Sequence, residues 1–214
     1  MPAPQPADDA DPAALADLPC RTPVEVLSLL ASPEHHYFGR ARDGSPHPPS
    51  PSLDRVEVVA GKGVVGDRFF GKAAHMDAAV TLLAVEALEG VAADLGLATP
   101  EDPLGGLDPR LARRNVLLRG APVVALVGAD LALDQRATGG DVVRFSGRRQ
   151  AAPCAWMDAV LAPGAHPALR GRGGLRCVPT SSGVLVVGPA ELRTAEPVDP
   201  AAAGVPVLRR GRLP

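Results

Sequence analysis

Short apolar runs, separated by glycine and proline, form the pattern of hydrophobic and polar positions along this chain. Alternating or continuous apolar runs of roughly four to eight residues between turn residues predict β-strands. The run at residues 53–60 alternates at Val56 and Val58 and ends at the turn Gly61-Lys62-Gly63. The ranges with this pattern are 24–30, 53–60, 79–83, 115–119, 130–134, 141–145, 175–179 and 184–187.

Two other segments have the spacing of helices. Apolar side chains of residues 85–95 fall on one helical face, and Gly96 gives a plausible C-terminal stop. Residues 155–161 predict a short helix, whereas residues 121–127 fit either a half-turn or a helix. Many short strands with two or three helices, outside strict βα alternation, indicate a β-barrel or sandwich with helical insertions.

Composition agrees with a chain of strands and turns, because 23 glycines and 24 prolines occur among 214 residues. Aromatic residues make up only 3%, so the core must be built from Val, Leu and Ala. Residues 1–21 are rich in Pro, Ala and Asp and predict a disordered acidic tail. Residues 195–214 predict a second tail, which ends in the basic cluster Arg209-Arg210-Gly211-Arg212. The expected folded domain is therefore 22–194.

Charge and cysteine content narrow the function classes. A net charge of −2 and a pI near 6.2 give no reason to expect nucleic-acid or anionic-membrane binding. No apolar run approaches the length that spans a membrane. Three widely spaced cysteines (Cys20, Cys154 and Cys177) argue against a disulfide framework and fit a reducing compartment. We expect a cytoplasmic protein with no nucleic-acid or membrane partner.

The segment Arg148-Arg149-Gln150-Ala151-Ala152-Pro153-Cys154-Ala155-Trp156-Met157 contains the strongest candidate for chemistry. A thiol reacts as the thiolate, which nearby cations or a helix N-terminus favour. Cys154 has two arginines upstream and precedes a predicted helix. A lone cysteine is otherwise a small buried hydrophobe, and both interpretations remain open at this point. Cys177, within an apolar run, is expected to be buried and inert.

Three turns could bind an anion. Gly63-Val64-Val65-Gly66-Asp67-Arg68 is either an anion-binding loop or a structural acid–base pair at a strand end. Arg113-Arg114-Asn115 precedes an apolar strand, and arginines there suit a phosphate or polar heterocycle unless they are merely solvent-exposed. Arg170-Gly171-Arg172-Gly173-Gly174 is a basic turn that binds phosphate or serves only as a turn.

The long Pro/Gly/Ser segment 32–52 contains the adjacent histidines His35 and His36. In a strand-like segment they point in opposite directions, and no third nitrogen or sulfur ligand lies nearby in sequence. A zinc site is therefore not expected. Arg40 adds one further candidate contact to an oxyanion.

In their order and spacing, these segments resemble the MOSC domain family, the C-terminal domain of molybdenum-cofactor sulfurases and its stand-alone bacterial relatives. The matching segments span about residues 53–190. They are Gly63-Val64-Val65-Gly66-Asp67-Arg68, Thr81-Leu82-Leu83 with Glu86 and Leu88, Arg113-Arg114-Asn115-Val116, Arg148 to Pro153-Cys154, Arg172-Gly173-Gly174, and Val184-Leu185-Val186-Val187-Gly188.

The resemblance implies an α+β, mainly β domain: a compact mixed β-barrel of the MOSC or pyruvate-kinase-barrel type with a few flanking helices. It implies that Cys154 carries sulfur as a persulfide or meets the molybdenum of a bound molybdenum cofactor (molybdopterin). The residues implied to bind the pterin and its phosphate are Asp67, Arg68, Arg113, Arg114, Asn115, Arg148 and Arg172, with His36 and Arg40 from the 32–52 segment.

Three functions are compatible with this resemblance. The first is sulfur transfer or molybdenum ligation through Cys154, with a separate cysteine desulfurase as sulfur donor and a molybdoenzyme as possible acceptor. The second is reduction of N-hydroxylated compounds with electrons from a separate electron-transfer protein. The third is non-catalytic carriage of the cofactor. Sulfurases also carry a pyridoxal-phosphate desulfurase domain for which this chain has no room, so pyridoxal phosphate is not expected to bind.

Overall fold

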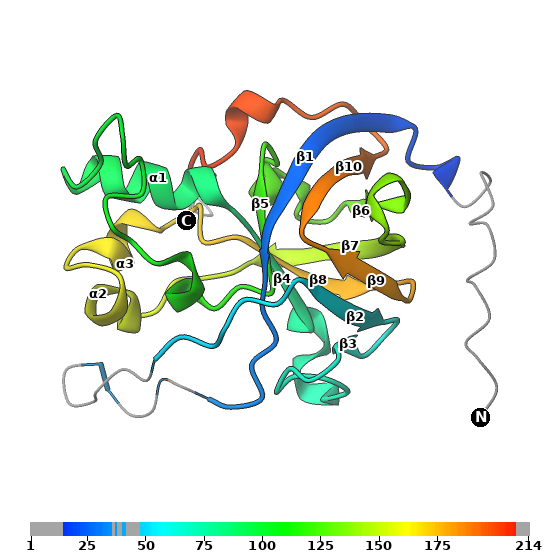
Figure 1. Cartoon of the computed structure of the whole chain (residues 1–214), viewed down its shortest axis with the longest axis horizontal. Helices are drawn as coiled ribbons and strands as arrows, with labels where there is room; N and C mark the ends of the chain where they lie inside the picture. The colour runs from blue at the N-terminus through cyan, green and yellow to red at the C-terminus, as the bar shows by residue number, and fades with distance from the viewer. Residues whose placement is uncertain (1–14, 36, 38–39, 42–47, 209–214) are drawn as a thin grey trace, which may run out of the picture.

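The computed structural model of the chain describes residues 15–35, 37, 40–41 and 48–208. Seven strands close into a barrel in which β4 and β5 run parallel and all other neighbours run antiparallel (Figure 1). Around the barrel, the strands are β1 (Cys20–Leu29), β10 (Gly188–Thr194), β6 (Asp130–Asp134), β7 (Val142–Gln150), β8 (Leu175–Pro179), β4 (Val80–Ala84) and β5 (Val116–Arg119). The predicted mainly β fold with a compact mixed barrel is confirmed.

A three-stranded sheet lies beside the barrel, in the order β3 (Gly63–Val64), β2 (Arg55–Val59) and β9 (Gly183–Val186). Its alternation follows the sequence, because Val56 and Val58 are buried while Arg55 and Glu57 are exposed. The buried valines belong to the same apolar cluster as the barrel interior. The small sheet thus extends the barrel core rather than forming a separate one.

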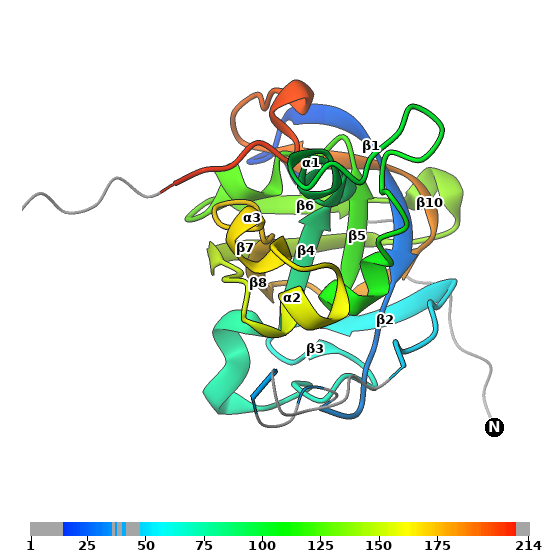
Figure 2. The same cartoon turned by 90° about the vertical axis from the view of Figure 1, so that its left-hand side faces the viewer.

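Three helices, α1 (Val85–Asp94), α2 (Trp156–Val160) and α3 (Ala165–Ala168), cover one side of the barrel (Figure 2). All five residues of β4 are buried, because one face of the strand lines the barrel and the other packs on the helices. Short 3-10 helices fill the connections. They are η2 (Ala73–Ala78), η3 (Pro109–Ala112), η4 (Val123–Leu126), η5 (Arg136–Thr138) and η6 (Pro200–Ala202).

The predicted elements occur with shifted limits. Strands β6 and β8 have the predicted limits, and β7 continues to Gln150. The undecided segment 121–127 contains the 3-10 helix η4. The short strand β3 and the strand β10 were not predicted, and β10 begins with Gly188-Pro189, two residues that are unfavourable within strands. No helix in the described part of the chain is long and apolar enough to span a membrane.

The folded body extends beyond both limits of the predicted domain 22–194. Leu15 and Leu18 are buried against Ala132, and β1 already begins at Cys20. At the other end, Val207 N donates to Gly171 O at 2.8 Å. The predicted tails were too long because each contains a few apolar residues that pack against the barrel. Residues 1–14 and the basic cluster from Arg209 onward lie outside the described residues.

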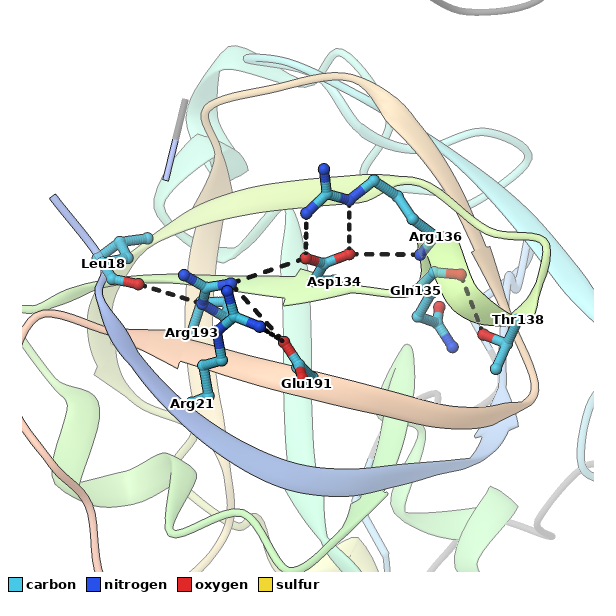
Figure 3. A network of polar contacts seen from close by, with 8 residues as sticks. All are labelled: Leu18, Arg21, Asp134, Gln135, Arg136, Thr138, Glu191 and Arg193. Carbon is cyan, nitrogen blue, oxygen red and sulfur yellow. Dashed lines mark hydrogen bonds and ion pairs between the residues drawn. The ribbon is translucent and has the colours of Figure 1, made fainter. Parts of the chain in front are cut away.

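Charged side chains tie the N-terminal turn to the barrel (Figure 3). Arg193 is 5% exposed, donates from Nε to Leu18 O at 3.2 Å, and lies 3.9 Å from the Asp134 carboxylate. Asp134 in turn accepts two hydrogen bonds from the Arg136 guanidinium, at 2.9 and 2.6 Å, and one from the Arg136 backbone N–H at 3.3 Å. The buried guanidinium is therefore compensated, and this network explains why residues 15–18 stay on the barrel surface.

Candidate functional site

Most of the predicted site residues meet at one end of the barrel. That end carries the turns after β1, β3 and β7 and the turns before β5 and β8. A small pocket there is lined by Leu30, Ser32, Asp67, Arg68, Phe69, Thr81, Arg113 and Asn115. We call it the arginine pocket. Three turns far apart in sequence thus contribute polar groups to one place.

Asn115 and Asp67 form the frame of the arginine pocket. Asn115 is buried; its Oδ1 accepts from Thr81 N at 2.9 Å, and its Nδ2 donates to Leu30 O at 3.1 Å and to Asp67 Oδ2 at 3.2 Å. Asp67 also accepts from the backbone N–H groups of Ser32 and Phe69. Their polar groups are used within the protein, so both residues position the pocket and leave little capacity for direct ligand contact.

Arg113 occupies an unusual backbone conformation at the end of η3. Among the described non-glycine residues it alone has a positive φ, with φ 55° and ψ 49°. That conformation costs on the order of 1 kcal/mol or more for a residue with a Cβ. It directs the side chain to Ser32 Oγ (2.9 Å) and Glu34 O (2.8 Å), with the guanidinium over the Tyr37 ring.

Arg68 is incompletely satisfied. Its Nη1 donates to Glu34 O at 3.3 Å, the same carbonyl oxygen that Arg113 uses. Its Nε is buried and has no hydrogen-bond partner among the described residues. Burial lowers the pKa of Arg68, and the Asp67 carboxylate opposes that shift. Two guanidiniums therefore share one neutral acceptor, an arrangement that an anionic oxygen would satisfy better.

Arg114 lies against the turn before β8. Its Nε donates to Gly173 O at 2.9 Å and its Nη1 to Ala112 O at 3.0 Å. Burial, with the nearby positive charge of Arg176 as the second cause, lowers the pKa of Arg114 to about 10, and Cys154 opposes the shift. The site thus concentrates positive charge beside a thiol.

Arg176 was not predicted and belongs to the same group. It projects from β8 between the buried Leu175 and Cys177, and is half-buried on the outer face of the barrel. Its guanidinium makes no hydrogen bond or ion pair with another described residue, and burial, with Arg149 second, lowers its pKa. We call Arg68, Arg113, Arg114 and Arg176 the arginine cluster. The two-residue alternation of Leu175-Arg176-Cys177 is the signal that would have found it.

Cys154 is exposed beside the arginine cluster, immediately before α2. Its carbonyl accepts from Met157 N at 2.9 Å, which starts the helical turn as predicted. Tyr37 packs on Trp156 with ring centroids 5.3 Å apart and donates its hydroxyl to Leu111 O. Burial, with the charge interaction of Cys154 as the second cause, raises the pKa of Tyr37 to about 12. The thiol is thus accessible and has an aromatic wall and cations as neighbours.

Arg172 does not point into this group. It is buried, donates from Nε to Ala168 O at 2.8 Å and pairs with Asp94 of α1. It fixes the turn whose Gly173 carbonyl holds Arg114. The turn packs tightly, because a Cβ on Gly173 would lie 2.2 Å from Ala151 O. Arg172 therefore helps to position Arg114 without facing the other arginines itself.

Of the remaining predicted residues, two are exposed and one lies outside the described residues. Arg148 is exposed, and its Nε lies 3.9 Å from Asp77 Oδ1. Arg40 is exposed, and His36 lies outside the described residues. Among the residues with described positions, no group of three His, Cys, Asp or Glu side chains could hold a metal ion. The structure thus concentrates the candidate chemistry on one thiol and four guanidiniums.

Accessibility separates the three cysteines and gives a first prediction. Cys154 is exposed, Cys20 is half-buried with its thiol 3.5 Å from Ala195 O, and Cys177 is fully buried. Burial raises the pKa of Cys177 well above its usual value, so its reactive thiolate is suppressed. We expect a thiol-specific reagent to modify Cys154 first and Cys177 only after unfolding. Peptide mapping over a time course measures this order, and early modification of Cys177 would contradict it.

Comparisons with known proteins bear on the fold of this chain and not on its chemistry. No protein-family model matches the sequence, and no curated protein matches it. The crystal structure of the YuaD protein from Bacillus subtilis superposes with a TM-score of 0.60 at 16% identity, covering 83% of this chain and 99% of that one. A crystal structure of a hypothetical protein gives a TM-score of 0.51 at 16% identity, covering 86% and 73%. At this identity the likeness establishes a shared compact β-rich fold.

Proposed function

We propose that this protein binds the molybdenum cofactor at the arginine cluster and uses Cys154 in sulfur transfer or as a ligand to the molybdenum. The observation that carries this proposal is an exposed thiol beside several guanidiniums that lack strong acceptors. The sequence resemblance to the MOSC family supplies the identity of the ligand, and the geometry supplies the reason to expect an anionic one.

The residues present fit such a group. Arg68 and Arg113 share the Glu34 carbonyl, and Arg176 has no partner among the described residues, so phosphate oxygens would gain charge-assisted hydrogen bonds from them. A thiolate is a soft ligand of the kind that such metals accept. When bound, the cofactor would supply a redox-active metal centre.

The chain's own groups have separable tasks. Arg68, Arg113 and Arg176 bind and orient the anionic part of the ligand. Arg114 stays in place through two carbonyl acceptors, and its charge interaction with the Cys154 sulfur is attractive. The stacked Tyr37 and Trp156 form an apolar wall beside the thiol. In sulfur transfer, the Cys154 thiolate attacks the outer sulfur of a donor persulfide; the donor S–S bond breaks, the donor thiolate leaves, and Cys154 keeps the persulfide.

Cofactor loading with matched variants tests the proposal. Wild-type protein incubated with molybdenum cofactor and desalted should retain molybdenum, measured by elemental analysis, and pterin, measured by fluorescence after oxidation. Cys154→Ser should lose sulfur transfer from a cysteine desulfurase, whereas the half-buried Cys20→Ser control should keep it. Failure of the wild type to retain the pterin would reject the proposal.

The same loading experiment discriminates among the roles of Cys154. Loss of molybdenum with retained pterin in Cys154→Ser would favour ligation, and persulfide on Cys154, detected by mass, would favour sulfur transfer. Reduction of an N-hydroxylated base by loaded protein with a chemical reductant would favour the reductase. Cofactor retention that is unchanged in Cys154→Ser, together with no sulfur transfer and no reduction by the wild-type protein, would leave only a cofactor carrier.

A further inference from the structure

A second, larger cleft lies at the opposite end of the barrel from the arginine cluster. Its volume is about 600 Å³, within the range of small-molecule sites. It is built where β1 and β6 begin and where β5 and β10 end, so it shares no residue with the arginine pocket. In Figures 1 and 2 the helix η6 beside it lies at the top, whereas the segment after β1 runs along the bottom.

Apolar side chains line much of this cleft. Leu18, Leu126 and Val198 come from three different segments, and alanine and proline residues such as Pro122 and Ala202 extend the apolar lining. Leu18 and Leu126 are buried in the protein, and Val198 packs against the barrel core. These anchored contacts give the cleft a preformed apolar surface that suits the body of a small organic molecule.

The charged residues of the cleft all have the same sign. Asp17, Asp130, Glu196 and Asp199 are among its lining residues, and the described lining contains no Lys, Arg or His. Asp17 is neutralised by Arg144, whose Nη1 donates to Asp17 Oδ1 at 2.9 Å, and the charge of Asp130 also acts on Arg144. Asp199 caps η6 with one carboxylate oxygen. The carboxylates of Asp130 and Glu196 and the second oxygen of Asp199 are exposed and accept no hydrogen bond from another described residue, so the cleft has a net negative charge.

From this combination we propose that the cleft binds a small organic cation with an apolar body, such as an aromatic amidine or amine. The apolar lining accommodates the body, and Asp130, Glu196 and Asp199 attract the positive group. A bare metal ion fits less well, because these carboxylates are not gathered into a metal-binding group among the described residues. Anions are repelled by the same charges. The proposal concerns a different end of the barrel from the proposed cofactor function and does not depend on it.

A charge series on wild-type protein is the primary test. Benzamidine, benzamide and benzoate have nearly the same shape and carry positive, zero and negative charge. We expect benzamidine to bind with a dissociation constant on the order of 1 mM, as for a fragment. Benzamide should bind at least about tenfold more weakly, and benzoate should not bind. Amide NMR titration should perturb residues around Ala125 and Ala195 and leave Arg114 unchanged.

Variants with the same change in net charge provide the control. Glu196→Gln combined with Asp130→Asn removes two charges from the cleft and should weaken benzamidine binding about tenfold or more. Glu101→Gln combined with Asp54→Asn removes two exposed charges elsewhere and should leave binding unchanged. Equal binding of benzamide and benzamidine, perturbations that map elsewhere, or equal effects of the two double variants would overturn the proposal. The charge series needs no variant, so it remains decisive if a substitution impairs folding.

Discussion

Replacing Asn115 with alanine is expected to lower the free energy of unfolding by about 3 kcal/mol. The Asn115 amide holds the N–H of Thr81, the carbonyl of Leu30 and the carboxylate of Asp67, which belong to three separate segments. The substitution would leave these groups without their partner, and each buried unsatisfied group costs about 1–3 kcal/mol. Urea denaturation followed by far-ultraviolet circular dichroism measures the change by linear extrapolation.

Two comparisons distinguish this role from simple loss of an amide. Asn115→Asp preserves the shape but places a carboxylate oxygen against Leu30 O and the Asp67 carboxylate, so it should destabilise at least as much as alanine. Gln150→Ala removes one hydrogen bond, the 2.8 Å contact to Val207 O, and should cost less than about 1 kcal/mol. An Asn115→Ala variant within 1 kcal/mol of wild type would contradict the assignment of Asn115 as the frame of the pocket.

Local patterns in the sequence predicted most of the barrel. Strands such as β6 and β8 show apolar runs between turn residues, and their limits follow directly from those runs. Strand β10 was missed because Gly188, Pro189, Glu191 and Arg193 break the apolar pattern. It is nevertheless paired on both sides, since β1 and β6 supply the hydrogen bonds and Asp134 compensates Arg193. Tertiary pairing thus overrode local propensity.

The position of a candidate site residue was predictable only where the side chains of its motif face the same pocket in the fold. Asp67, Arg68, Arg113 and Asn115 line one pocket, and it was the resemblance of their segments to the MOSC family that implied a shared pocket. Arg172 has the same basic character, but its neighbour Asp94 is supplied by α1, 78 residues away in sequence, and holds the side chain away from the cluster. The partner of a charged residue depends on the three-dimensional fold, so a basic motif in the sequence does not reveal it.

The same reasoning explains why Arg176 escaped notice and why it matters. An isolated arginine between two buried residues of a strand reads as an ordinary outward-facing side chain. In the fold it approaches Arg114, and the two positive charges disfavour one another. Arg114 is compensated by two carbonyl acceptors, whereas Arg176 is not compensated by any described residue. A cation kept half-buried without a partner is the kind of local cost that binding sites carry and ligands relieve.

Arg176→Met is therefore expected to change stability and binding in opposite directions. Removal of an uncompensated charge should leave the ligand-free protein as stable as wild type or more stable, by up to about 1 kcal/mol. Retention of the cofactor, or of inorganic phosphate as a simple anion, should weaken at least about tenfold, because a charge-assisted contact is lost. Urea denaturation and equilibrium dialysis against labelled phosphate provide the two measurements.

Arg114→Met is the informative contrast, because the two arginines are neighbours but differ in their acceptors. Loss of Arg114 leaves the Gly173 and Ala112 carbonyls without their donor, so stability and anion binding should fall together. Arg148→Met removes an exposed arginine whose one ion pair with a described residue is that with Asp77, and it should change neither quantity appreciably. If Arg176→Met destabilised the protein without weakening anion binding, Arg176 would be a structural residue. The ligand-binding cluster would then be confined to Arg68, Arg113 and Arg114.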